Sequence, residues 1–379
     1  MREVVVAGTG VAPFGTMRRR TEDMVLDAGL DALKRAGLRF AEVGAVYAGY
    51  INAPVTTGVR VMKEFGLTGV PVQHVENASA TGAATFREAY LAVAGGHVDA
   101  ALAIGFDNLG GKGSGLGRGM GRNSLEGAIL PAAFFALWAR RRMHDYGTTV
   151  ETFAAIAAKN WNHARHCDWA QRRSDHDVTV DEVLASTLIA DPHTSMMSCA
   201  VGGGAAAAVV VSDELADRLD LSRPRVRVLA SAMQSERYTP GHVFLGPVIG
   251  PSQMTADTAA EAYERAGVGP DDLDLVQVHD AFPIEELVYY ELLGICADGE
   301  GDKLVATGET SLGGRIPFST DGGLIARGHP GGPTGLAQIH ETVVQLQGEA
   351  GARQVPNATV GLCHLVGAGS TCVVHILGR

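Results

Sequence analysis

The sequence predicts an α/β protein made of two similar lobes, because one pattern occurs twice along the chain. Residues 35–38 (Arg-Ala-Gly-Leu) precede an apolar, strand-like run that ends near residue 48, and residues 265–268 (Arg-Ala-Gly-Val) precede a similar run at 273–278. A constant offset of 230 positions aligns the two, from Arg35 to Arg265. A repeated unit of helix, glycine turn and strand indicates two lobes of the same fold.

The other elements follow the same repeat. An opening strand and a helix-period segment are expected at 3–7 and 21–35 in the first lobe, and at 226–230 and 252–265 in the second. Each lobe also has a later helix, at 81–94 and 334–346, and both helices open with Thr-Gly. Strand, helix, strand and second helix thus occur twice in order. We assign residues 1–222 to the first lobe and 223–379 to the second.

A stretch at about 107–191 lies outside the repeat. It opens with a glycine-rich run at 110–117 and continues through helix-like segments at 131–146 and 150–165. Long insertions in compact domains commonly form lids or binding loops, so we expect this one to cover the active site. Within it, the arginines at 140–142 are interpreted as a solvated helix face, and His163 and His166 as solvated helix-end residues.

Composition excludes several classes of function. The formal net charge of −11 argues against a nucleic-acid surface, and 46% hydrophobic against 19% charged residues permits a large core. Five cysteines without a Cys-x-x-Cys pair indicate reduced thiols and no zinc site, and the start has no signal-peptide shape, so we expect a cytoplasmic protein. No apolar run reaches the length of a membrane span.

Because Gly8-Thr9-Gly10 is followed by Pro13 where a dinucleotide fingerprint needs glycine, we expect no permanently bound cofactor.

Four segments combine reactive side chains with glycine-rich turns. They are 75–82 (Val-Glu-Asn-Ala-Ser-Ala-Thr-Gly), 278–282 (Val-His-Asp-Ala-Phe), 328–335 (Gly-His-Pro-Gly-Gly-Pro-Thr-Gly) and 363–370 (Cys-His-Leu-Val-Gly-Ala-Gly-Ser). With the repeat and the insertion, these motifs resemble the thiolase superfamily over nearly the whole chain. The resemblance is closest to the sterol-carrier-protein type and to bacterial and archaeal relatives that pair with a small OB-fold protein.

The resemblance implies a thiolase fold of two βαβαβ lobes in five layers, α-β-α-β-α, with a lid or loop insertion. Its two central helices would begin near Thr81 and Thr334 and pack against each other. It also implies coenzyme A or an acyl-CoA as substrate and a homodimer formed through a strand at 72–75. A small zinc-ribbon OB-fold protein is a further expected partner.

The resemblance also assigns roles to four residues, which we expect to converge on one pocket. Ser79 stands where the family has its nucleophilic cysteine, and His329 stands where a histidine activates that nucleophile. His279 matches the histidine that helps to hold the thioester oxygen while an enolate forms. Gly367 matches the glycine that supplies a backbone N–H to a second oxyanion hole.

Two positions depart from the family pattern. Ala281 and Leu365 stand where different branches of the family place the cysteine that moves the proton of the carbanion. Cys363 and His364 lie nearby in sequence and are the lower-ranked candidates for this role.

Three functions remain open after these substitutions. The first is an acyl-CoA acyltransferase that cleaves a β-ketoacyl-CoA or forms one by Claisen condensation, which Ser79 serves poorly because a serine has no low-pKa form comparable to a thiolate. The second is a retro-aldol lyase acting on a β-hydroxyacyl-CoA, of the steroid side-chain aldolase kind, which needs no nucleophile. The third is a non-catalytic carrier of acyl-CoA or lipid, or a structural subunit.

Overall fold

The computed structural model describes residues 2–15, 19–108, 131–200, 202–219, 221–237, 253–367 and 371–379, and the backbone of 242–243 and 246–247. Its main strands are β1 (Val4–Gly15), β2 (Ala45–Gly49), β3 (Val72–Val75), β4 (Ala100–Asn108), β7 (Gly203–Ser212), β8 (Val226–Ser235), β11 (Leu275–Gln277), β12 (Val360–Gly367) and β13 (Thr371–Gly378). They form one mixed sheet in the order β11-β12-β13-β8-β1-β7-β4-β2-β3. Only Val5–Arg227 and Val6–Val226 join β1 to β8, so the sheet divides there into two halves.

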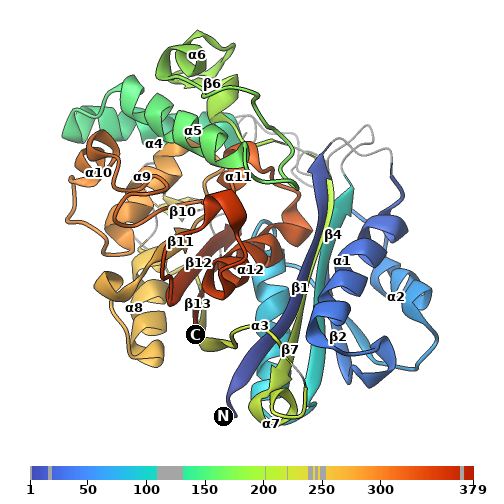
Figure 1. Ribbon diagram of the computed structural model, residues 1–379. Helices are drawn as coiled ribbons and strands as arrows, with labels where there is room; N and C mark the ends of the chain where they lie inside the picture. Colours follow the sequence, from blue (N-terminus) through green and yellow to red (C-terminus); the bar gives the residue numbers. More distant parts are fainter. Residues whose placement is uncertain are drawn as a thin grey trace.

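Helices cover these half-sheets in layers (Figure 1). The helices that form the layers are α1 (Thr21–Ala36), α2 (Thr57–Met62), α3 (Thr81–Ala94), α8 (Met254–Ala266), α9 (Pro283–Leu292) and α12 (Gly331–Gln347). Helices α1 and α2 share a buried core with the outer face of the first half, and α8 and α9 share one with the second. Residues of α3 and α12 form a third core between the halves. The predicted α/β class and five-layer order are confirmed.

The internal repeat is confirmed in backbone detail. Helices α1 and α8 both end at an alanine that is followed by a glycine in the left-handed region, Gly37 and Gly267, each with φ 68°. A 3-10 turn follows each glycine, at Phe40–Glu42 and Pro270–Asp272, before β2 and β11. Glycine takes this conformation without the steric cost that a Cβ brings, which explains why the turn could be read from the sequence.

The insertion folds onto the second half of the sheet. Its described elements are α4 (Pro131–Tyr146), α5 (Val150–Ala164), α6 (Val180–Ala185), β5 (Leu188–Ala190) and β6 (His193–Thr194), shown in green above α9 in Figure 1. The glycine-rich run at 110–117 lies outside the described residues. The remaining short elements are α7 (Asp213–Ala216), β9 (His242–Val243), β10 (Gly246–Pro247), α10 (Gly301–Thr307) and α11 (Gly323–Ala326). No helix among the described residues is long and apolar enough to cross a membrane.

Two expectations about the insertion were wrong. Arg142 is not solvated, because it is buried and donates to the carboxylate of Glu291 at 2.8 Å. His163 is also buried, where its Nε2 accepts from the backbone N–H of Leu312 at 3.0 Å. Both partners lie about 150 positions away in the sequence, so the local pattern contained no sign of them.

Helices α3 and α12 meet at positions where only glycine fits. A Cβ on Gly335 would lie 2.2 Å from the backbone nitrogen of Ala83, and one on Gly82 would lie 2.7 Å from the carbonyl oxygen of Gly332. Every residue of α12 from Gly331 to Leu346 is buried. A helix that is buried on all sides belongs to the core of the whole molecule.

We expect Gly335→Ala to lower the free energy of unfolding by at least about 2 kcal/mol, because a close-packed backbone contact cannot absorb an added methyl group. Urea unfolding followed by circular dichroism measures this change. Gly269→Ala is the matched control, since a Cβ at Gly269 would have its nearest neighbour at 3.8 Å. Equal unfolding midpoints for the two variants would show that the helices do not approach this closely.

Candidate active site

Ser79 lies in a tight turn between β3 and α3. Ala78 has φ 48°, a left-handed conformation that is uncommon for a residue with a side chain. The hydroxyl of Thr81 holds the turn, because it donates to the carbonyl of Ala78 at 2.6 Å and accepts from the N–H of Asn77 at 2.9 Å. Such backbone strain is typical of functional sites, where surrounding contacts maintain it. The turn places Ser79 directly before the N-terminus of α3.

Ser79 is hydrogen-bonded to His329, which precedes α12. The distance from Ser79 Oγ to His329 Nε2 is 3.0 Å, and His329 Nδ1 lies 3.0 Å from the hydroxyl of Thr334. That hydroxyl donates its own proton to the carbonyl of Pro330, so it accepts from Nδ1–H of His329. Burial, together with the nearby His279 and Arg327, lowers the pKa of His329 well below its usual range. The ring is therefore neutral and accepts the Ser79 proton at Nε2.

His279 lies beside this pair, after the end of β11. Its ring is perpendicular to that of His329, with the centroids 5.2 Å apart. Its Nδ1 is 2.7 Å from Oε1 of Glu285, in the first turn of α9. Its Nε2 is buried and has no hydrogen-bond partner in the described part of the chain. His279 and His329 thus lie next to each other, but different side chains are hydrogen-bonded to their Nδ1 atoms.

Gly367 brings the end of β12 against the Ser79 turn. A Cβ at this position would lie 2.1 Å from the carbonyl oxygen of Asn77 and 3.1 Å from the Cβ of Ala80. Only glycine permits this close approach. The structure therefore brings Ser79, His279, His329 and Gly367 together, as expected from the motifs.

The lower-ranked candidates have other surroundings. Cys363 faces α12, with its sulfur 3.1 Å from the hydroxyl of Thr342, and burial raises its pKa to about 12. His364 points away from α12, with Nε2 3.2 Å from the hydroxyl of Thr255, and burial lowers its pKa to about 3. Neither side chain has a contact with Ser79 or His329 among the described hydrogen bonds. Leu365, in contrast, packs with residues of α3 next to the Ser79 turn.

Two buried carboxylates stabilise the site. Neither one was identified as a supporting group from the sequence. Asp107, at the end of β4, accepts from the N–H groups of Asn52 and Gly332 at 2.9 and 2.6 Å, and thus ties the first lobe to the start of α12. Asp280, next to His279, accepts at 2.8 Å from both Asn160 of α5 and the N–H of Leu324. Asp280 therefore fixes the insertion to α11, which precedes His329.

One further cysteine contacts the His-Asp-Ala-Phe loop. The backbone N–H of Cys199 donates to the carbonyl of Ala281 at 2.9 Å. Burial raises the pKa of its thiol to about 12, so it is not a thiolate at neutral pH. Within the described residues, no group of three or more His, Cys, Asp or Glu side chains is arranged to hold a metal ion. The site therefore offers two imidazoles, a hydroxyl and backbone amides.

Comparison with known proteins gives consistent matches. Residues 4–214 match the family model for the thiolase N-terminal domain, and residues 248–379 match the model described as thiolase C-terminal domain-like. The chain is 35% identical to an acetyl-CoA acetyltransferase of Methanothermobacter thermautotrophicus over 100% of both chains. It is 34% identical to the benzoylsuccinyl-CoA thiolase subunit BbsB of Thauera aromatica, covering 97% of this chain and 95% of that one. Sterol carrier protein 2 of Bos taurus is 34% identical, with 98% of this chain and 72% of the relative covered.

Two solved structures share the fold. One is the Ltp2-ChsH2(DUF35) aldolase, with a TM-score of 0.84 and 24% identity over 100% of this chain and 98% of that chain. The other is an acetyl-CoA acetyltransferase from Syntrophomonas wolfei, with a TM-score of 0.72 and 18% identity over 100% and 99%.

The surroundings of His364 generate a prediction about pH and stability. Because its pKa is about 3 in the folded chain, His364 takes up a proton below about pH 6.5 only when the chain unfolds. This histidine therefore lowers the free energy of unfolding as the pH falls, by up to about 1.4 kcal/mol per pH unit. We expect His364→Gln to reduce the dependence of that free energy on pH between about pH 4 and 6.

Urea unfolding at a series of pH values measures this dependence. His97→Gln is the matched control, since it removes a histidine from an exposed position. The same slope in His364→Gln as in the unmodified chain would contradict the buried, neutral state of His364.

Proposed function

Since the chain belongs to the thiolase family, we propose that it makes or breaks a carbon–carbon bond next to a coenzyme A thioester, by aldol-type cleavage of a β-hydroxyacyl-CoA. One observation carries the choice of reaction. Ser79 occupies the position of the nucleophile, and the base beside it is a neutral histidine whose Nδ1 has, among the described residues, only the hydroxyl of Thr334 as its support. The acyl-CoA is the substrate, and the proposal needs no resident cofactor.

The supporting groups explain why acyl transfer through Ser79 is disfavoured. A serine becomes a good nucleophile when its histidine is backed by a carboxylate, and loss of that carboxylate costs about 10⁴-fold in serine proteases. Here the carboxylate of Glu285 contacts His279 and not His329. The carboxylate therefore supports His279, and His329, the histidine that contacts Ser79, lacks this support.

Aldol-type cleavage fits the groups that are present. The reaction needs a base for the β-hydroxyl and a polar environment for the enolate of the thioester, but no covalent intermediate. His279 lies beside His329, and the backbone at Gly367 lies against the Ser79 turn, so these two groups can serve the two needs. A carrier of acyl-CoA would need neither histidine, so their convergence supports an enzyme.

Acyl transfer through Ser79 is the second candidate. The 3.0 Å contact between Ser79 Oγ and His329 Nε2 favours it, because nucleophile and base lie within hydrogen-bond reach and Thr334 orients the base. Acetyltransferase and thiolase relatives of similar length add to this support. In this case the chain would cleave or form a β-ketoacyl-CoA through an ester on Ser79.

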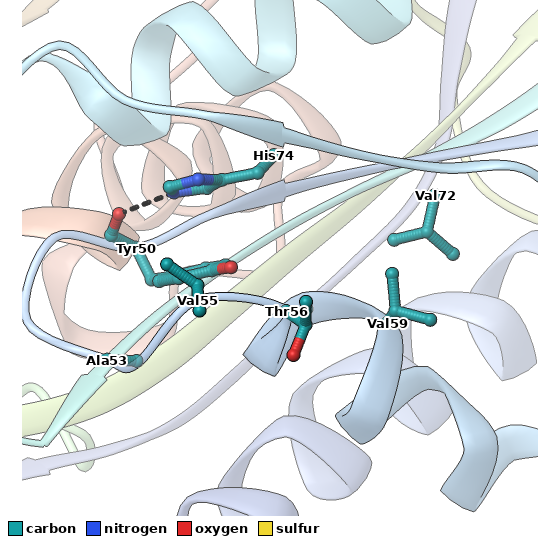
Figure 2. A pocket seen from close by; sticks show the side chains of 8 residues that line it. Tyr50, Ala53, Val55, Thr56, Val59, Val72 and His74 are labelled. Carbon is teal, nitrogen blue, oxygen red and sulfur yellow. Dashed lines mark hydrogen bonds between the residues drawn. The ribbon is translucent and has the colours of Figure 1, made fainter.

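We also propose that the chain forms a homodimer through β3. In the described sheet this strand lies at the edge and pairs only with β2. A cavity of about 300 Å³ lies beside this strand and is lined by Val55, Val59 and Val72 (Figure 2). On the same cavity wall, the ring of His74 stacks on the ring of Tyr50. Val55 is 87% exposed, and an apolar group next to an open strand edge is commonly covered by a partner. A small OB-fold protein remains the proposed second partner.

Substitution of residue 79 separates the two reactions. If cleavage is of the aldol type, Ser79→Ala should keep β-hydroxyacyl-CoA cleavage within about tenfold, and no acyl adduct should form on the unmodified chain. Product release and intact-protein mass spectrometry measure these results. Ser79→Cys is the positive control for acyl transfer, because a thiol at this helix N-terminus can accept an acyl group.

An acyl adduct on Ser79 of the unmodified chain, with loss of all turnover in Ser79→Ala, would establish the acyltransferase instead. The absence of product from every form, together with no adduct on Ser79→Cys, would support a carrier.

A second test concerns the dimer. Val55→Glu should shift the chain toward monomer at micromolar concentration, because a charge would be buried beside the β3 edge. Sedimentation velocity measures the change. Leu188→Glu is the matched control, since Leu188 is 62% exposed on β5 in the insertion. A monomeric unmodified chain would contradict the proposal, and equal dissociation of both variants would place the interface elsewhere.

A further inference from the structure

The hydrogen bond between the carboxylate of Glu285 and His279 determines which nitrogen of the imidazole carries a proton. Glu285 stands six residues after His279, and the intervening loop closes on itself through their 2.7 Å hydrogen bond. Both side chains are buried, with 6% of His279 and 2% of Glu285 exposed. A contact of this kind, sheltered from water, fixes the orientation of the imidazole ring.

The other hydrogen bonds to the Glu285 carboxylate in the described part of the chain come from donors. Its Oε1 receives the hydroxyl of Tyr289 at 3.3 Å as well as His279 Nδ1, and its Oε2 receives the N–H of Phe282 at 3.3 Å. Burial, together with Glu285 itself, raises the pKa of Tyr289 well above its usual range, so the phenol keeps its proton and donates it. With both carboxylate oxygens used as acceptors, the proton of the His279–Glu285 contact lies on Nδ1 of the histidine.

With the proton on Nδ1, the uncharged form of the His279 ring has its lone pair at Nε2. That nitrogen is buried without a partner among the described residues, on the edge of the ring opposite Glu285. The ring of His329, which binds Ser79, stands perpendicular to it at 5.2 Å. With its proton on Nδ1, the uncharged His279 ring offers an acceptor at Nε2 to the site, whereas the family resemblance implies a donor to the thioester oxygen.

We propose that His279 is the general base of the cleavage and that Glu285 is its positioning residue; this inference rests on the proposed aldol-type function. Nε2 of His279 takes the proton from the β-hydroxyl, whose oxygen forms the new carbonyl. The bond between the α and β carbons breaks, and its electron pair forms the thioester enolate. The imidazolium then returns the same proton to the α carbon, which yields a carbonyl compound, a shortened acyl-CoA and a neutral His279.

The protonation of His279 can be measured without turnover. We expect nitrogen-15 NMR of histidine-labelled protein at neutral pH to show a protonated Nδ1 and an unprotonated Nε2, with the signals assigned by their loss in His279→Gln. In Glu285→Gln this preference for one tautomer should decrease. A proton on Nε2 of His279 in the unmodified chain would overturn the proposal.

Turnover gives the second test. With a β-hydroxyacyl-CoA that the unmodified chain cleaves, Glu285→Gln should lower kcat on the order of 10²-fold and leave KM nearly unchanged, because the base loses its support and the substrate contacts remain. Glu285→Asp should recover part of the activity. Glu264→Gln, at an exposed position of α8, is the matched control and should have no effect.

The possible failures are distinguishable. Unchanged kcat in Glu285→Gln would reject the role of the His279–Glu285 pair and leave aldol-type cleavage standing. Failure of the unmodified chain to cleave any β-hydroxyacyl-CoA would reject the proposed function, and with it the assigned base, whatever tautomer NMR finds.

Discussion

The close contact between α3 and α12 is the constraint on which the active-site geometry depends. Helices with ordinary side chains at the interface pack about 8–10 Å apart, and the glycines at 82 and 335 leave no space for a Cβ in this contact. Ser79 and His329 each stand two positions before the first residue of one of these helices. Their 3.0 Å hydrogen bond therefore depends on the distance between the helices. Asp107 adds a third element, since it holds the start of α12 to the loop after β2.

Features that depend on local backbone rules could be predicted from the sequence. Gly37 and Gly267 mark the same left-handed helix end in both lobes, and the strand and helix periods around them define the repeat. The meeting of Ser79 with His329 was also foreseen, because the motifs containing them resemble those of a family whose site is built from the same segments. Both predictions used patterns that are contained in continuous segments of the chain.

Features that depend on a distant partner could not be predicted. Arg142 and His163 were expected to be solvated, yet each is buried with a partner about 150 positions away. The strain at Ala78 likewise gave no sign in the sequence, since alanine is uncommon in that conformation. For His279 the motif identified the residue but not its hydrogen bond to the carboxylate of Glu285.

The convergence of α3 and α12 also determines the electrostatic potential of the site. Each helix N-terminus carries roughly half a positive charge, and neither helix has an acidic residue in its first turn to offset it. Two such ends at one point favour any negative charge that develops between them and oppose a further positive charge. This potential belongs to the backbone and not to residue 79. A change of the side chain at that position therefore alters which atom reacts, while the potential that stabilises the resulting anion stays the same.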